Sequence, residues 1–448
     1  MAHDTKIAGF AGRWSKALAK HKLIPHALAA AFACALSACA SPTAPAVIQV
    51  SAPTKAEESD FLGALALLNK QDRPLAGINL MEKLVEKGQL DSRTFAQFYA
   101  VTGDERGVYA LIDQGLKPNL EKPIDTTGYS PQPAMEAIIN AARDRHVVML
   151  NEDHTMQRQR AFAFEVATQL RKIGFTHFGA ETFTPELAES MKDGSPKLRT
   201  GIYTLDPVFA DLARHAAKIG YQLFDYEIRK SQKPVDSADQ NTQRAMREQA
   251  QADNIRKILD TNPNAKMFIY VGGGHASKHP EPNGLEMMAL RLKRMTGIDP
   301  LVIDQLIGTP RASPERDGAF YRGVANLGIQ TASIVMTNAS GQWLTRPGHD
   351  LAVFHPRVPD IAGRPGWLSM NGYRKPYPLT LAAMPMKTLV RAFVSAEPAG
   401  SIPMDQILVA PNQRGVTLML PVGKYNIVRQ SETGESTEVG SVVMPSRE

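Results

Sequence analysis

The chain has 448 residues, of which 43% are hydrophobic and 21% are charged. This composition is typical of globular proteins and excludes a collagen-like, coiled-coil or largely disordered chain. With only two cysteines, a disulfide framework and a zinc site built from cysteines are also excluded.

The net charge of +6 comes mostly from the N-terminus. The first 38 residues hold five Lys and Arg and one acidic residue, so the other 410 carry 46 basic and 44 acidic residues, a net of +2. A nearly neutral body lacks the basic surface that binding to DNA or RNA requires. We therefore expect no nucleic-acid partner.

Residues 1–38 have the features of a secretory signal peptide. Four cations between Arg13 and Lys22 precede an apolar stretch, 27–36, whose ten residues are too few to span a bilayer. The stretch ends in Leu36-Ser37-Ala38-Cys39, which resembles the bacterial lipobox. The alternative is a plain signal peptide with an incidental cysteine. We expect cleavage before Cys39 and lipidation of that residue.

Lipidation at Cys39 predicts a location and a partner. Cys34 leaves with the leader, so no disulfide can form, and the mature chain is held at a membrane by its N-terminal lipid. Residue 40 is Ala rather than the Asp that commonly retains bacterial lipoproteins in the inner membrane. We expect a protein of the bacterial cell envelope, anchored in the outer membrane and facing the periplasm. Residues 39–60, rich in Pro, Ala, Thr and Ser, form a flexible tether.

Residues 61–120 are predicted to be a helical segment. Apolar residues share one helix face around Met81, and Gly88 follows as a stop signal. The stretch 109–119 faintly resembles the exit of an ankyrin-type repeat, but the two weak copies in this segment are fewer than a stable array needs. We interpret the segment as a small helical cap or adaptor through which a protein partner could bind.

Residues 133–308 alternate between short apolar runs and amphipathic stretches. This pattern predicts an α/β fold with a mainly parallel sheet flanked by helices. The expected strands are 146–150, 177–181, 221–225, 266–271 and 301–304, and the expected helices are 162–173, 207–219, 238–259 and 285–292.

The remaining chain changes character. Short β-type runs punctuated by Pro, Gly and Asn dominate it. We expect residues 309–384 to extend the core and residues 385–448 to form a small antiparallel β-rich module, which is either a domain or a lid.

Polar side chains follow the predicted strands. Glu152 and His154 come after the first, Glu181 ends the second, Asp225 ends the third, and His275 follows three glycines after the strand 266–271. Because parallel α/β sheets bind ligands beyond the carboxyl ends of their strands, these residues are expected to converge at one edge of the sheet.

Two imidazoles and two carboxylates support more than one chemistry. They can hold a divalent metal with an open position, whose bound water has a pKa near ~7 in the best zinc sites. A carboxylate–histidine pair can also activate water without metal. Arg247 and Lys278 are candidates for binding an anionic part of the substrate, and Asp225 is a further candidate for substrate binding at the same edge. The alternative is that these three charges are solvated or paired on the surface, and that Glu152 and Glu181 cap helices.

The order Glu152-x-His154, then Glu181, then Gly272-x-x-His275 resembles the superfamily of erythromycin esterases, ChaN-type haem-binding lipoproteins and TIKI/TraB proteins. The polar helix around Arg247 looks like the Arg-rich helix before the last motif in several of these groups. The resemblance covers about residues 133–308. The first motif of the family normally starts with Gly, where this chain has Asn151, a residue that tolerates left-handed backbone.

The resemblance implies roles for the four residues. In the protease-like branch they are metal ligands and base, so His154, Glu181 and His275 are the expected ligands if Mn, Zn or Co is bound. In the esterase branch similar residues, here Glu152, His154, Glu181 and His275, activate water without metal. In the ChaN branch the fold carries haem or iron.

Three functional hypotheses follow. The first is a lipid-anchored hydrolase that cleaves an ester or amide in a small molecule or peptide. The second is a binding lipoprotein that holds haem or iron at the same edge, and the third is a degenerate fold that serves as an envelope scaffold.

Overall fold

The computed structural model describes residues 55–114, 119–233, 239–325, 327, 329 and 332–446. The predicted signal peptide, Cys39 and most of the predicted tether lie outside these residues. Within the described part of the chain, no helix combines the length and the apolar character needed to cross a bilayer.

A segment of helices precedes the sheet. Asp91 and Asp104 start two of these helices, because their carboxylates accept the backbone N–H groups of Thr94 and Gly107. The helices share an apolar core that also includes Leu205 of the following α/β region. They are α3 (Lys55–Asn69), α4 (Pro74–Glu86), α5 (Ser92–Tyr99), η1 (Ala100–Thr102) and α6 (Glu105–Asp113).

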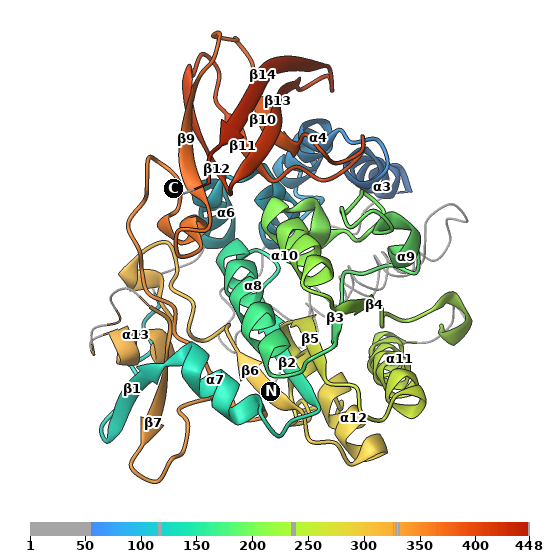
Figure 1. The fold of residues 1–448 in the computed structure, drawn as a ribbon, viewed down its shortest axis with the longest axis vertical. Helices are drawn as coiled ribbons and strands as arrows, with labels where there is room; N and C mark the ends of the chain where they lie inside the picture. Colours follow the sequence, from blue (N-terminus) through green and yellow to red (C-terminus); the bar gives the residue numbers. More distant parts are fainter. Residues whose placement is uncertain are drawn as a thin grey trace.

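The centre of the molecule is a six-stranded sheet in which every pair of neighbours is parallel (Figure 1). The strand order is β4-β3-β5-β2-β6-β8. The predicted α/β class with a mainly parallel sheet is therefore confirmed. The strands are β2 (Val147–Glu152), β3 (His177–Ala180), β4 (Gln222–Phe224), β5 (Met267–Gly272), β6 (Leu301–Asp304) and β8 (Leu351–Ala352).

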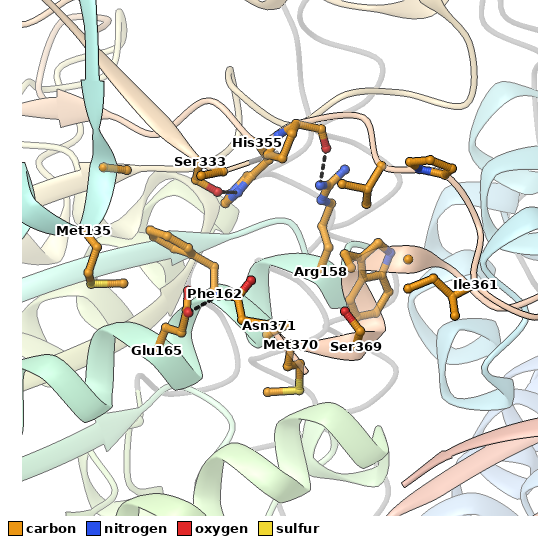
Figure 2. A pocket seen from close by; sticks show the side chains of 18 of the residues that line it. Met135, Arg158, Phe162, Glu165, Ser333, His355, Ile361, Ser369, Met370 and Asn371 are labelled. Atoms are coloured by element: carbon orange, nitrogen blue, oxygen red, sulfur yellow. Dashed lines mark hydrogen bonds between the residues drawn. The ribbon is translucent and has the colours of Figure 1, made fainter. Parts of the chain in front are cut away.

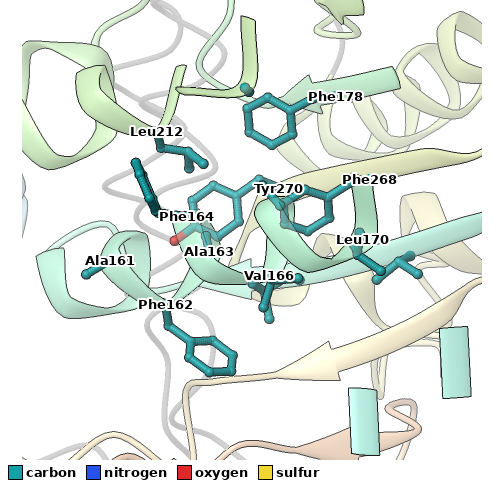
Figure 3. Close-up of a cluster of buried hydrophobic side chains, with 14 of the residues drawn as sticks. Ala161, Phe162, Ala163, Phe164, Val166, Leu170, Phe178, Leu212, Phe268 and Tyr270 are labelled. Atoms are coloured by element: carbon teal, nitrogen blue, oxygen red, sulfur yellow. The ribbon is translucent and has the colours of Figure 1, made fainter. Parts of the chain in front are cut away.

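Helices cover both faces of the sheet. Side chains of successive strand residues point to opposite faces, so Phe268 and Tyr270 pack with Leu212 of α10 and with α8 (Figure 3), whereas Met267 and Ile269 pack with Ile255 of α11. The helices are α7 (Ala134–Ala142), α8 (Gln157–Lys172) and α10 (Pro207–Lys218) on the first face and α11 (Gln240–Thr261) and α12 (Met288–Thr296) on the second.

The C-terminal part is β-rich, as expected, and is drawn in orange and red in Figure 1. A four-stranded antiparallel sheet has the order β11-β10-β13-β14, and two further antiparallel pairs, β9 with β12 and β1 with β7, lie outside it. The strands are β1 (Tyr129–Pro133), β7 (Ile334–Asn338), β9 (Lys375–Thr380), β10 (Thr388–Val394), β11 (Asp405–Val409), β12 (Gly415–Leu420), β13 (Gly423–Ser431) and β14 (Ser436–Met444).

Strands β1 and β9 were not expected, because each contains two prolines, which cannot donate hydrogen bonds within a sheet. Both belong to two-stranded pairs, where one side of the strand needs no partner. Short helices complete the chain: α9 (Leu187–Ser190), η2 (Tyr203–Leu205), η3 (Lys230–Gln232), η4 (Gly273–Ala276), η5 (Pro314–Arg316), α13 (Ala319–Ala325) and η6 (Gly366–Ser369).

Buried ion pairs join the β-rich part to the helices of the core. Arg374, just before β9, donates from Nη2 to Asp211 of α10 at 2.6 Å and from Nη1 to the carbonyl of Met404 at 3.0 Å. Both charged side chains are almost fully buried. Removing one partner of a buried pair leaves the other charge uncompensated.

We predict that Asp211→Ala lowers the free energy of unfolding by about 3–5 kcal/mol, because Arg374 loses its counter-charge. Urea denaturation followed by circular dichroism measures the change. The control Glu189→Ala breaks the exposed pair with Lys192 and should change stability by less than about 1 kcal/mol. An Asp211→Ala variant as stable as the parent would show that this pair does not hold the two parts together.

Candidate functional site

The four residues expected to carry the chemistry lie together at the carboxyl edge of the sheet. Glu152 is the last residue of β2, Glu181 follows β3, and His275 lies in η4 directly after β5. His154 follows Glu152 by two residues. All four side chains are at most 5% exposed.

One half of the site is built around a buried arginine of α8. Arg160 donates from Nε to Glu152 at 2.9 Å and from Nη1 to Asp206 at 2.7 Å. The other oxygen of Glu152 lies 2.7 Å from Nδ1 of His154. The ring of Tyr203 stacks on His154 with 4.0 Å between the ring centroids.

The other half is built around Arg247 of α11. Its Nη2 donates to Glu181 at 2.6 Å and to Glu227 at 2.5 Å, and its Nη1 lies 2.9 Å from Nε2 of His275. Glu248, the next residue of α11, lies 2.5 Å from Nδ1 of His275. Arg247 was expected to bind substrate, but in this conformation it is buried and holds two carboxylates and an imidazole.

Gly272 joins the two halves. Its backbone N–H donates to Oε2 of Glu181 at 2.5 Å. A Cβ at this position would lie 2.5 Å from Nε2 of His154 and 2.8 Å from Oε2 of Glu181. Both side chains therefore meet at the same Cα, and only glycine leaves room for them.

The arginines keep the carboxylates ionised despite burial. Burial raises the pKa of Glu152, but the charge of Arg160 and the hydrogen bonds from His154 and Arg160 outweigh it and lower this pKa to about 2. Burial likewise opposes ionisation of Glu181, yet the charges of His275 and Arg247 hold its pKa well below the usual range. Asp206 differs, because burial dominates and raises its pKa.

These charges fix the protons on the histidines. An ionised carboxylate only accepts hydrogen bonds, so Nδ1–H of His154 donates to Glu152. In the neutral ring the lone pair of His154 is therefore on Nε2, which faces Gly272 as Oε2 of Glu181 does. An arginine only donates, so Nε2 of His275 accepts and its Nδ1 proton faces Glu248. Burial lowers the pKa of His275, but the carboxylates of Glu248 and Glu181 raise it above its usual value.

The donor set does not fit a metal ion. Among the described residues, no three His, Cys, Asp or Glu side chains are grouped so that they could hold one. In the expected ligands, Nε2 of His275 lies 3.6 Å from Oε1 of Glu181, and the guanidinium of Arg247 already binds both atoms. A metal cation at this point would be repelled by the positive charge of Arg247.

The site is closed in this conformation. A narrow recess between Glu152, His154, Glu181 and Tyr203 leaves no space for a water molecule. The hydroxyl of Tyr203 donates to the side-chain oxygen of Gln97 on α5 at 3.1 Å. The N-terminal helices and Tyr203 therefore cover the imidazole.

Two expected site residues lie elsewhere. The ammonium of Lys278 binds both oxygens of Asp350 at 2.7 Å and the carbonyl of Pro300, just before β6. Lys278 therefore lies at the amino-terminal end of this strand, opposite the site, and its expected role there is wrong. Asp225 pairs with Arg229 at 2.8 Å, and within the described part of the chain it forms no hydrogen bond or ion pair with the four residues.

Asn151, which stands where the family's first motif has Gly, was considered for its tolerance of left-handed backbone, but it does not lie in a turn. It is part of β2, its side-chain N–H donates to Asp304 at 2.8 Å, and its oxygen accepts the backbone N–H of Gln305 at 2.7 Å. Asn151 thus links β2 to the end of β6.

Sequence reasoning missed Arg160, Asp206 and Tyr203. A signal for Arg160 is present, since 157–160 reads Gln-Arg-Gln-Arg at the start of a helix that directly follows the Glu152-x-His154 motif. Nothing in the sequence marks Asp206 or Tyr203, which reach the site from a distant loop.

We predict that Gly272→Ala displaces the side chains of His154 and Glu181, because the new Cβ overlaps both of them. The matched control is Gly274→Ala, whose Cβ would lie 3.4 Å from the nearest atom, the methyl of Met287. Thermal unfolding should show a clear loss of stability for Gly272→Ala and little change for Gly274→Ala. Equal melting temperatures would contradict the crowding of the two side chains at Gly272.

The low pKa of Glu152 predicts a pH dependence of stability. A carboxyl whose pKa falls from about 4.5 to about 2 on folding stabilises the protein above about pH 4.5, and this contribution is lost as the pH falls toward 2. Glu152→Gln should therefore be less stable than the parent at pH 7, with a difference that shrinks as the pH falls through this window. Urea denaturation at several pH values measures it, and a constant difference would contradict the prediction.

Comparison with known proteins gives no family for this chain, since no family model and no curated protein matches it. The solved structures that match do so weakly, and three of them illustrate this. The type III effector HopBA1 is 16% identical over 52% of this chain and 98% of its own, with a TM-score of 0.32. RRSP, a MARTX toxin effector domain from Vibrio vulnificus CMCP6, is 15% identical over 53% of this chain and 44% of its own, with a TM-score of 0.26. The C-terminal region of Pasteurella multocida toxin, described as having a thiol-protease-like catalytic triad, is 9% identical over 84% of this chain and 51% of its own, with a TM-score of 0.30. At these TM-scores, none of the three bears on the function of this chain.

Proposed function

We propose that the protein is a hydrolase that cleaves an ester or amide with water activated by His154. One observation carries the proposal: Nε2 of His154, oriented through Nδ1 by the ionised Glu152, and Oε2 of Glu181 both face Cα of Gly272, on either side of the space that a Cβ there would fill. A carboxylate–histidine pair beside a second carboxylate is a suitable base for water.

In the proposed reaction, a water molecule binds between His154 and Glu181. Nε2 of His154 takes a proton while the water oxygen attacks the carbonyl carbon, and the tetrahedral intermediate forms. The proton then passes from Nε2 to the leaving alcohol or amine as the bond to the carbonyl carbon breaks. Glu152 stabilises the charged imidazole, and Arg247 and His275 are positioning residues that hold Glu181.

This reaction requires the recess to open. Tyr203 lies on the imidazole and is tied to Gln97 of the helical segment, so substrate enters only when η2 moves away from His154. Such movements of covering segments are common in enzymes that exclude water from a reactive group.

The resemblance to erythromycin esterases and TIKI proteins supports the hydrolase, and the lipobox at Cys39 supports a lipid anchor in the bacterial outer membrane. A second candidate, a scaffold without catalysis, is favoured by the closed recess. The predicted haem site has no comparable support, because the recess is far smaller than a porphyrin.

The test is hydrolysis of 4-nitrophenyl butyrate and of a fluorogenic peptide by the purified full-length chain. We predict that Glu181→Gln and His154→Ala each lower the rate about 100-fold or more, since acid–base groups typically contribute this much. His275→Ala should lower it less, because this residue acts through Glu181.

Two exposed residues that are close in sequence to Glu181 and His275 serve as matched controls. Glu186→Gln and His279→Ala change the same residue types at exposed positions and should leave the rate unchanged. Full activity in both Glu181→Gln and His154→Ala would reject the hydrolase, and inactivity of the parent toward both substrates would favour the scaffold.

A further inference from the structure

A second cavity lies on the opposite side of α8 from the candidate site. It has a volume of about 540 Å³ and lies between α8, the start of α7 and the segment 355–371. In Figure 2, Arg158, Phe162 and Glu165 of α8 border it below the loop that carries His355. Cavities of this size are typical of sites for small organic ligands.

The walls of the cavity are mainly apolar. The larger apolar side chains of its lining are those of Met135, Phe162, Ile361, Trp367 and Met370. Aromatic rings and thioethers adapt to flat or flexible apolar groups. The walls therefore suit a ligand with an aromatic or alkyl body.

The lining contains a buried cation. Arg158 is only 7% exposed, and in the described part of the chain its one hydrogen bond runs from Nη2 to the carbonyl of Pro356, at 2.6 Å. No carboxylate among the described residues forms an ion pair with it. Burial therefore lowers the pKa of Arg158 with incomplete compensation from its neighbours. An unpaired buried arginine is costly unless an anion joins it.

The acidic groups around the cavity already have partners. Glu165 accepts from the amide of Asn371, and Asp360 pairs with Arg106 at 2.6 Å. Glu105, behind the cavity wall, accepts the indole N–H of Trp367 at 2.7 Å. Arg158 is thus the one cation in this lining, and it forms no ion pair with a described carboxylate; the charge of Glu105 only partly offsets its burial.

A serine offers a further polar contact. Nε2 of His355 lies 3.1 Å from the side-chain oxygen of Gln305, so the proton of the neutral ring is on Nε2. Nδ1 must then accept the hydroxyl proton of Ser333 at 2.8 Å (Figure 2). The lone pairs of the Ser333 oxygen are left for a donor on a ligand.

We propose that this cavity binds a small organic acid, with its carboxylate on Arg158 and its apolar body against Phe162, Trp367 and Met370. Arginine binds carboxylates with two parallel hydrogen bonds, and the guanidinium has unused donors for them. A hydroxyl or N–H group on the ligand would reach Ser333. The site is independent of the proposed hydrolysis.

Decanoate and 2-naphthoate are the probes, because they present the same carboxylate on an alkyl and on an aromatic body. Each is compared with its neutral primary amide by calorimetry on the full-length chain. We expect the acids to bind at least 10-fold more tightly than the amides. Tighter binding of decanoate would indicate a lipid-derived ligand, and tighter binding of 2-naphthoate an aromatic one. In the Trp14→Phe, Trp343→Phe chain, Trp367 is the remaining tryptophan and its emission should change on binding.

Arg158→Gln should weaken binding of the acids about 10-fold or more and leave the affinity for the amides unchanged. Arg158→Lys should restore part of the affinity for the acids. Arg145→Gln, which alters a pair with Asp299 on the surface, is the control and should bind both acids normally. Unchanged melting of Arg158→Gln shows that the fold is intact. Equal binding of acid and amide, full binding by Arg158→Gln, or no binding of either acid at millimolar concentration would overturn the proposal.

Discussion

The burial of Arg247 between Glu181 and Glu227 is the interaction on which the carboxyl edge of the sheet depends. Each of these carboxylates would be strongly disfavoured in the interior without a cation. Arg160 does the same for Glu152 and Asp206 on the other side of the edge. Two arginines from two helices therefore allow four carboxylates to be buried where the strands end. This explains why α11 is polar although much of it is covered, since Arg247, Glu248, Gln251 and Asn254 are all buried in this network or beside it.

The convergence of Glu152, His154, Glu181 and His275 was predictable because it follows from geometry that any parallel sheet imposes. Apolar runs locate the strands, and the residues after them share one edge. The positions of Lys278 and Arg160 did not follow, because they depend on how the chain continues. After η4 the chain turns back and brings Lys278 to the amino-terminal end of β6, and Arg160 is selected by the carboxylates it must neutralise. Strands β1 and β9 were missed since their prolines contradict the usual strand pattern, which a two-stranded pair tolerates.

Helix α8 separates two environments with opposite requirements. Residues two positions apart on a helix face away from each other, so Arg158 and Arg160 point to different sides. Arg160 meets two carboxylates at the sheet edge, whereas Arg158 meets a carbonyl and apolar walls. The same residue type thus offsets buried carboxylates on one side of the helix and leaves a positive charge at a cavity on the other.

The helices that cover His154 are tied to the far end of the chain. Asp72, between α3 and α4, pairs with Arg391 of β10 at 2.7 Å, and Gln430 of β13 donates to the Asp72 carbonyl at 2.9 Å. These partners are separated by more than 300 residues, so during synthesis this surface of the helical segment has no partner until the last strands have been made. This outer surface of the helical segment is therefore completed last, and a nascent or C-terminally shortened chain would leave the carboxylate of Asp72 without Arg391.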